Sequence, residues 1–233
     1  SAVSSLALLR LVAQRLAGPR LADPAAVVRH LGAAQAQDLP GALISVALRS
    51  QDDSRAAVDA ALAAGQIVRS WPMRGTLHLV PADDLGWILS LTAARMLSGA
   101  ESRRIDLGIS DAVIARAAEI ALAELAGGRR LRRKELFAHW ADDGLLAHAQ
   151  TGYHLLGRLC QEAILVLGPL DGTEQLVVSY ADWVPAPRRL AHDEALAELA
   201  RRFFLSHGPA TAADLARWAS LTLTAARAGA AAV

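Results

Sequence analysis

Two glutamines separated by a single residue, Gln35 and Gln37, are the first feature of the sequence that suggests chemistry. A glutamine carbonyl oxygen accepts hydrogen bonds and the amide donates them, but the side chain cannot take up a proton as a carboxylate does. Such a pair can orient a water molecule without ionising. Residues i and i+2 point to the same side only on an extended backbone, so cooperation requires a non-helical segment. The alternative is two loop glutamines that cap neighbouring backbone groups.

Asp38 and His78 are candidates for catalytic support. Asp38 adjoins the glutamine pair and is a possible general base if burial raises the pKa of its carboxyl group, although capping of the helix expected around Pro40 is the commoner role. His78 follows Thr76 by two residues on an expected strand, so both side chains can face one cleft, but a core histidine is the simpler interpretation. The sequence has no metal-ligand spacing, glycine-rich phosphate loop or Ser-His-Asp signature, so neither a metal nor another cofactor is expected.

The elements that must position these residues begin with four expected helices. Hydrophobic spacing and capping residues place them at 4–16, 24–33, 41–48 and 54–65. The glutamine pair falls between the second and third helices, where Pro40 also biases Leu39 away from helix. A period-two pattern then predicts two strands, at 67–71 and 76–80, that flank the segment Pro72-Met-Arg-Gly75. Helices followed by a hairpin predict a winged-helix unit.

The same order of elements recurs along the chain. After helices at 81–97 and 110–125, joined by a polar connection over 99–108, the sequence predicts helices at 132–142 and 151–161 and strands at 163–167 and 174–179. The turn between those strands is Pro169-Leu-Asp-Gly172. Helices at 192–206 and 211–218 begin a third copy, which is followed by alanine-rich sequence without a period-two segment.

These patterns predict a mainly α fold with short β-hairpins (α+β). It consists of tandem winged-helix units over residues 1–98, 99–187 and 188–233, and the third unit is expected to be incomplete. The hydrophobic fraction of 53%, with only 4% aromatic residues, agrees with closely packed small helices. The formal net charge of +1 does not by itself indicate a nucleic-acid partner.

Composition also bounds the cellular setting. The single cysteine, Cys160, excludes an internal disulfide and a multi-cysteine zinc site, and it is expected to be a buried apolar residue, with a nucleophile as the alternative. The sequence has neither a run of about 18 apolar residues nor a signal core. A soluble, cytoplasmic protein that does not contact membranes is therefore expected.

Three segments carry a resemblance to a known family. They are Gln35-Ala-Gln-Asp38, Arg69-Ser-Trp-Pro-Met-Arg-Gly-Thr-Leu-His-Leu-Val80 and His207-Gly-Pro-Ala-Thr-Ala-Ala-Asp-Leu-Ala-Arg-Trp218. Together they resemble the AlkZ-like winged-helix DNA glycosylases, over essentially the whole chain. The second and third segments identify the family, whereas Gln-x-Gln alone is too short to do so.

The resemblance implies tandem winged helices around a concave DNA-binding surface, and hydrolysis of the N-glycosidic bond of alkylated purines, crosslinked ones included. The catalytic motif of the family, Gln-apolar-Gln or Asp, falls on Gln35, Ala36 and Gln37. Alkylation at N3 or N7 leaves the purine cationic, so its departure needs little help from an acid. Placing water is the remaining task, and it suits two glutamines.

Basic residues supply candidate DNA contacts. Arg69 and Arg74 on the first wing either contact phosphate or a minor groove, or form structural ion pairs. A denser run lies at an expected helix start and comprises Arg129, Arg130, Arg132, Arg133 and Lys134. Positive side chains at the positive end of a helix dipole repel it, and a bound anion would relieve this repulsion. The alternative is a solvated charged face.

The sequence thus predicts a monofunctional, cofactor-free DNA glycosylase of base excision repair. It is expected to act as a monomer on double-stranded DNA that carries alkylated purines. The alternative is a non-catalytic winged-helix DNA-binding protein or regulator, because this architecture serves binding more often than bond cleavage. A scaffold that pairs with another chain is a third possibility.

Overall fold

The computed structural model describes residues 2–233, and local capping signals place its first helices close to where the sequence predicts them. These helices are α1 (Ala2–Ala13), α2 (Pro24–Leu31), α3 (Leu39–Ala47) and α4 (Arg55–Ala63). The Asp23 carboxylate accepts from Ala26 N at 2.8 Å at the start of α2, and the Ser54 hydroxyl accepts from Ala57 N at 3.1 Å at the start of α4. Leu39, expected outside the helix, is its first residue, because a proline in the first turn removes only an N–H that has no intrahelical partner.

Two strands follow as an antiparallel hairpin with a very tight turn. They are β2 (Ile67–Met73) and β3 (Thr76–Pro81). Only Arg74 and Gly75 form the turn, both at positive φ (55° and 62°), as two-residue hairpin turns require. The expected turn was longer, but Pro72 and Met73 belong to β2, where the register shifts.

The second unit repeats helices and hairpin. It is preceded by η1 (Ala82–Asp84) and α5 (Leu85–Gly99), which fall at the end of the first predicted unit. It contains α6 (Glu101–Asp106), α7 (Asp111–Leu125), α8 (Arg133–Asp142), α9 (Thr151–Gln161), β4 (Leu165–Asp171), β5 (Glu174–Ser179) and α10 (Tyr180–Trp183). The polar connection expected over 99–108 contains the helix α6, which the sequence did not predict. A salt bridge between Glu101 and Arg104, one helical turn apart, stabilises this short helix.

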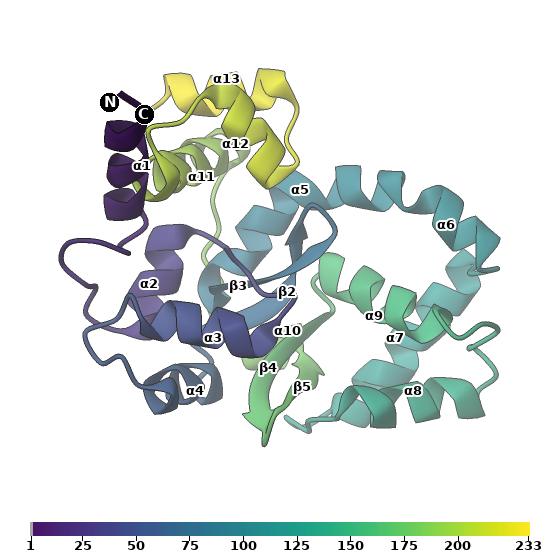
Figure 1. Ribbon diagram of the computed structural model, residues 1–233. Helices are drawn as coiled ribbons and strands as arrows, with labels where there is room; N and C mark the ends of the chain where they lie inside the picture. Colours follow the sequence, from purple (N-terminus) through teal and green to yellow (C-terminus); the bar gives the residue numbers. More distant parts are fainter. Residues whose placement is uncertain (1) are drawn as a thin grey trace.

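The remaining helices are α11 (His192–His207), α12 (Ala212–Ala219) and α13 (Leu223–Ala231). No strand is described between residues 188 and 233. In Figure 1 these helices lie together near α1, on the side of the molecule opposite β4 and β5.

A single antiparallel sheet joins the first two units. Its order is β1-β3-β2-β4-β5, where β1 is Ala34–Gln35, and the units meet at the pairing of Arg69 with Leu167. Figure 1 shows the two hairpins side by side at the centre of the molecule, with α2–α4 on one side and α6–α9 on the other. The mainly α fold with short hairpins is confirmed, while the boundaries of the units stay a prediction.

The β2–β3 hairpin contributes to all three clusters of the hydrophobic core. Trp71 and Leu77 pack with the helices of the second unit, Ile67 and Leu79 with α2–α4, and Val80 with α5 and α11–α13. Every residue of β2 is buried, so the strand has core on both faces. The hairpin is therefore the piece on which the three regions converge.

Asp84 anchors a buried ionic cluster between α2, η1 and α11. Its side chain is inaccessible to solvent and accepts from Arg29 at 3.1 Å, Arg188 at 2.8 Å, Arg202 at 2.5 Å and the Trp87 indole at 2.8 Å. Because a buried carboxylate needs such partners, the cluster fixes how α11 sits against the first unit. Among the helices of residues 2–233, none has both the length and the apolar character needed to cross a bilayer.

Candidate functional site

The Gln-Ala-Gln segment, residues 35–37, has the extended backbone that cooperation of the glutamines requires. β1 pairs with β3 so that Gln35 lies opposite His78, and Ala36 N donates to Leu77 O at 2.7 Å. Gln35 and Gln37 are exposed, whereas Ala36 between them is fully buried. Gln35 ends β1, Ala36 continues the pairing with β3, and Gln37 lies in the bend that leads to α3. The prediction of a non-helical segment is confirmed.

The side chain of Gln37 is held in one orientation. Its Oε1 accepts a hydrogen bond from Leu77 N at 3.0 Å. Because the partner is a donor, the amide oxygen rather than the nitrogen must point to the strand. One lone pair and both amide hydrogens stay available. Gln35 has no side-chain hydrogen bond within the described part of the chain, so the two glutamines differ in how firmly they are held.

Arg69 holds the Gln-Ala-Gln backbone from behind. The guanidinium donates to Ala36 O from Nε at 2.9 Å and from Nη2 at 2.5 Å, and Nη2 also reaches Gln37 O at 3.3 Å. Only 8% of Arg69 is exposed, and burial lowers the pKa of its guanidinium. It forms no salt bridge within residues 2–233, so the alternative of a structural ion pair does not describe its placement, and the phosphate contact stays a prediction. The sequence could not show this contact, because only the pairing of β1 with β3 brings the segment close to Arg69 on β2.

Gln37 and Arg69 line a cavity of about 530 Å³ between the first two units, here called the Gln37 cavity. The first unit also supplies Leu39, Trp71 and Leu77, and the second supplies Arg133, Tyr153, Leu156, Leu167, Thr173, Glu174 and Gln175. Gln35 does not line it. Sequence reasoning missed Tyr153, Glu174 and Gln175, because no local signal marks a residue of one unit as facing a motif of the other.

His78 is a core residue whose ring supports Arg74. Burial lowers the pKa of His78 to about 4, so the imidazole is neutral near pH 7. Nδ1 lies 2.9 Å from Thr76 O and therefore carries the hydrogen, which leaves Nε2 to accept from the Arg74 guanidinium at 3.2 Å. A neutral ring with both nitrogens engaged is a poor proton carrier, so the geometry favours the core-histidine interpretation.

Asp38 lies at the N-cap position of α3 but makes no side-chain capping hydrogen bond. The capping role expected for it is therefore wrong. Proline at the second position of the helix lacks one of the N–H groups that a cap would satisfy. Asp38 is exposed and next to Gln37, but it does not line the Gln37 cavity.

The basic run does not act as a unit. Arg129 donates to carbonyl oxygens at the end of α7, Arg130 stacks over the Trp183 ring at 4.9 Å, and Arg132 pairs with Asp171. Helix α8 begins only at Arg133, so intramolecular partners rather than a bound anion satisfy the first three charges. Arg133 lies over the Tyr153 ring at 5.9 Å and lines the Gln37 cavity, whereas Lys134 is exposed.

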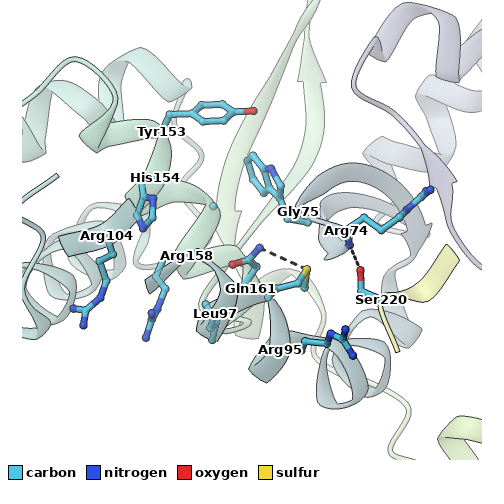
Figure 2. Close-up of a pocket in the computed structure, with 15 residues that line it drawn as sticks. Arg74, Gly75, Arg95, Leu97, Arg104, Tyr153, His154, Arg158, Gln161 and Ser220 are labelled. Atoms are coloured by element: carbon cyan, nitrogen blue, oxygen red, sulfur yellow. Dashed lines mark hydrogen bonds between the residues drawn. The ribbon is translucent and has the colours of Figure 1, made fainter. Parts of the chain in front are cut away.

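A second cavity, of about 450 Å³, adjoins the first. Figure 2 shows it between α5, α9 and the turn of the β2–β3 hairpin. Its charged lining residues are Arg74, Arg95, Arg104 and Arg158, and it is here called the arginine cavity. Trp71 and Tyr153 line both cavities, and their rings meet edge to face with centroids 5.6 Å apart. This aromatic pair thus forms the boundary between the two cavities.

Cys160 lies outside both cavities. It is fully buried, and burial raises the pKa of its thiol, which agrees with the expected apolar role. Within residues 2–233 no three His, Cys, Asp or Glu side chains come together in a way that could hold a metal ion.

Two helix–hairpin units that share one sheet, with an extended Gln-Ala-Gln segment beside a cavity between them, define a tandem winged-helix protein. The chain belongs to the AlkZ-like DNA glycosylase family, whose model matches residues 28–233. The family predicted from the sequence is thereby confirmed.

Two comparisons with individual proteins agree with this assignment. An interstrand DNA cross-link repair glycosylase from Streptomyces sahachiroi is 30% identical in an alignment that covers 85% of this chain and 55% of the relative. The solved structure of the Streptomyces sahachiroi DNA glycosylase AlkZ is similar with a TM-score of 0.76 and 26% identity, over 94% of this chain and 61% of that chain. The chain therefore spans little more than half the length of the curated relative it matches.

Proposed function

We propose that this protein is a monofunctional DNA glycosylase that hydrolyses the N-glycosidic bond of N3- or N7-alkylated purines in double-stranded DNA. The observation that carries the proposal is the Gln-Ala-Gln segment, held extended at the edge of a cavity between the two winged-helix units. Both amide side chains are exposed on this non-helical segment, and that of Gln37 lines a space of a size typical for small-molecule sites.

In the proposed reaction the alkylated base leaves as a neutral molecule and water attacks the anomeric carbon. Gln35, with a free carbonyl oxygen, accepts a hydrogen bond from that water. Gln37, whose oxygen is tied to Leu77 N, offers its amide hydrogens to the sugar or a phosphate oxygen. The proton that the attacking water loses passes to bulk solvent and not to either side chain, so the rate gain comes from orientation of preformed dipoles.

Glu174 supplies the negative charge of the Gln37 cavity. The ground-state base and the oxocarbenium-like sugar of the transition state are both cationic, and a carboxylate in the wall stabilises such charge. The Arg133–Tyr153 contact lines the same cavity and offers an aromatic face for a base. Glu174 thus contributes electrostatically, beside the two glutamines.

Crosslinked purines belong to the proposed substrates as well. The curated relative is by its name a glycosylase of interstrand DNA cross-links. The match to that relative covers 85% of this chain, and the family model covers the region of the glutamine pair. We propose that it acts as a monomer and without a cofactor.

The test is release of N7-methylguanine and N3-methyladenine from duplex DNA under single-turnover conditions. The double variant Gln35→Ala, Gln37→Ala should lose about 100-fold or more in rate, the scale of removing oriented hydrogen-bonding groups from an active site. Gln51→Ala is the matched control, because Gln51 is exposed and lines neither cavity, and it should keep the wild-type rate.

Two results would overturn the proposal. Unchanged release by the double variant would remove the glutamines from the mechanism. No release by the wild-type protein from any alkylated duplex, together with sequence-preferring binding of undamaged DNA, would identify a non-catalytic DNA-binding protein or regulator.

A further inference from the structure

The arginine cavity differs from the Gln37 cavity in that its charged lining residues are all arginines. Within the described chain no Asp or Glu lines the arginine cavity, whereas Glu174 lines the other. Two of its four arginines are neutralised from outside it: Arg104 pairs with Glu101 and Asp111, and Arg158 pairs with Glu162.

The other two arginines carry uncompensated charge. Arg95, exposed on α5, has no carboxylate partner among residues 2–233, and Arg74 donates only to the neutral ring of His78. His154 in the wall adds no charge near pH 7, because burial and then Arg158 lower its pKa. The arginine cavity therefore holds a net positive charge that no residue of the described chain balances.

The position of that charge is fixed on two sides. Arg74 lies in the hairpin turn, and its backbone N–H donates to Ser220 Oγ at 2.9 Å, which ties the turn to the connection between α12 and α13. Figure 2 shows Arg95 and Arg74 on one side of the cavity and His154 and Arg158 on the α9 side, with Gln161 between them. The Arg74 side chain extends away from Gln161 in Figure 2 and contacts His78, so an anion at this edge of the cavity would lie near guanidinium groups held by separate elements, which suits phosphate oxygens.

We propose that the arginine cavity binds a backbone phosphodiester of the DNA strand whose base enters the Gln37 cavity. The strand crosses the Trp71–Tyr153 pair, with its backbone on the arginine side and a base on the glutamine side. Arg95 is the principal phosphate ligand and Arg74 the second. The proposal rests on the proposed function in one respect, that DNA is the partner, and it names the residues that place the strand.

The experiment measures binding of a fluorescein-labelled duplex over a series of NaCl concentrations. Arg95→Gln and Arg74→Gln should each weaken binding about tenfold, as loss of a charge-assisted hydrogen bond does. Each should also reduce the slope of log K against log [NaCl] by about 0.9, the value for one phosphate contact in B-DNA. Arg227→Gln is the matched control, since Arg227 is an exposed arginine on α13 that lines neither cavity, and it should change neither quantity.

A duplex with one methylphosphonate beside the lesion locates the contact. Wild-type protein should lose about tenfold on this substrate, whereas Arg95→Gln should bind both duplexes alike, because the phosphate contact is already gone. An unchanged slope for Arg95→Gln would overturn the proposal. So would binding of inorganic phosphate that Arg95→Gln removes while duplex binding stays the same. This binding experiment does not depend on base release. If the protein binds as expected but releases no base in the separate release assay, only the proposed function is refuted.

Discussion

Replacement of Arg69 by methionine tests whether the Gln-Ala-Gln segment must be held in place. Methionine keeps most of the apolar stem but removes the guanidinium that donates to Ala36 O and Gln37 O. Arg69 is buried behind the segment, so on this reasoning it acts by positioning the segment.

The expected size of the effect follows from the contacts. Arg69→Met leaves the carbonyl oxygen of fully buried Ala36 without its guanidinium donors, at a cost of about 1–3 kcal/mol. Removal of a buried charge that has no counter-ion offsets part of the loss of the hydrogen bonds. A net loss of about 2 kcal/mol corresponds to a melting temperature about 4–8 °C lower in a chain of this length. A shift of the segment by about 1 Å costs on the order of 100-fold in rate.

The assay compares single-turnover base release with the Kd for the same duplex. Arg69→Met should slow release about 100-fold while Kd changes less than about twofold, and Arg69→Lys should fall between, because an ammonium is not a planar fork. Thr92→Val is the control, since Thr92 Oγ1 is buried and donates to Pro72 O at 2.5 Å on the same hairpin without contacting the segment. It should lower stability but keep the rate. If Arg69→Met behaves like Thr92→Val, Arg69 is merely structural.

Two further predictions concern stability. Asp84→Asn should lower the free energy of unfolding by about 3 kcal/mol or more, measured by urea denaturation, because three arginines lose this shared carboxylate and buried Arg202 keeps only Glu198 as an acidic partner; a loss below about 1 kcal/mol would contradict this. The protein should be less stable at pH 5 than at pH 7, because His78 with its pKa lowered to about 4 takes up its proton in the unfolded state first. His78 contributes on the order of 2 kcal/mol to this loss of unfolding free energy. His78→Gln should therefore reduce the difference in stability between the two pH values. An unchanged difference would show that His78 does not cause it.

Sequence alone predicted best those features that depend on neighbouring residues. The caps at Asp23, Ser54, Ser110 and Thr211 are confirmed, because each hydroxyl or carboxylate accepts from an N–H three residues on. The bounds of α9 were predicted correctly from its apolar spacing. Extended backbone at the glutamine pair was predicted because it too depends on local constraints, a helix end and a nearby proline.

What sequence could not predict depends on contacts across the chain. Arg69 looks like an exposed wing residue until β1 is paired with β3, which brings Ala36 against it from 33 positions away. Tyr153 and Glu174 have no motif of their own and gain meaning only because β2 pairs with β4. The basic run suggested one anion site, but Asp171 and Trp183, both distant in sequence, engage Arg132 and Arg130.

The β2–β3 hairpin makes the candidate site a property of both units together. Through β3 it holds Gln37, and through Trp71 it reaches Tyr153 of the second unit, where the two cavities meet. An isolated first unit would keep both glutamines but would lose Glu174 and the far walls of both cavities. It would also expose Trp71, which packs among second-unit helices. The glutamine motif therefore requires the shared sheet for its setting, which explains why a three-residue pattern is a weak signal alone and a specific one within this fold.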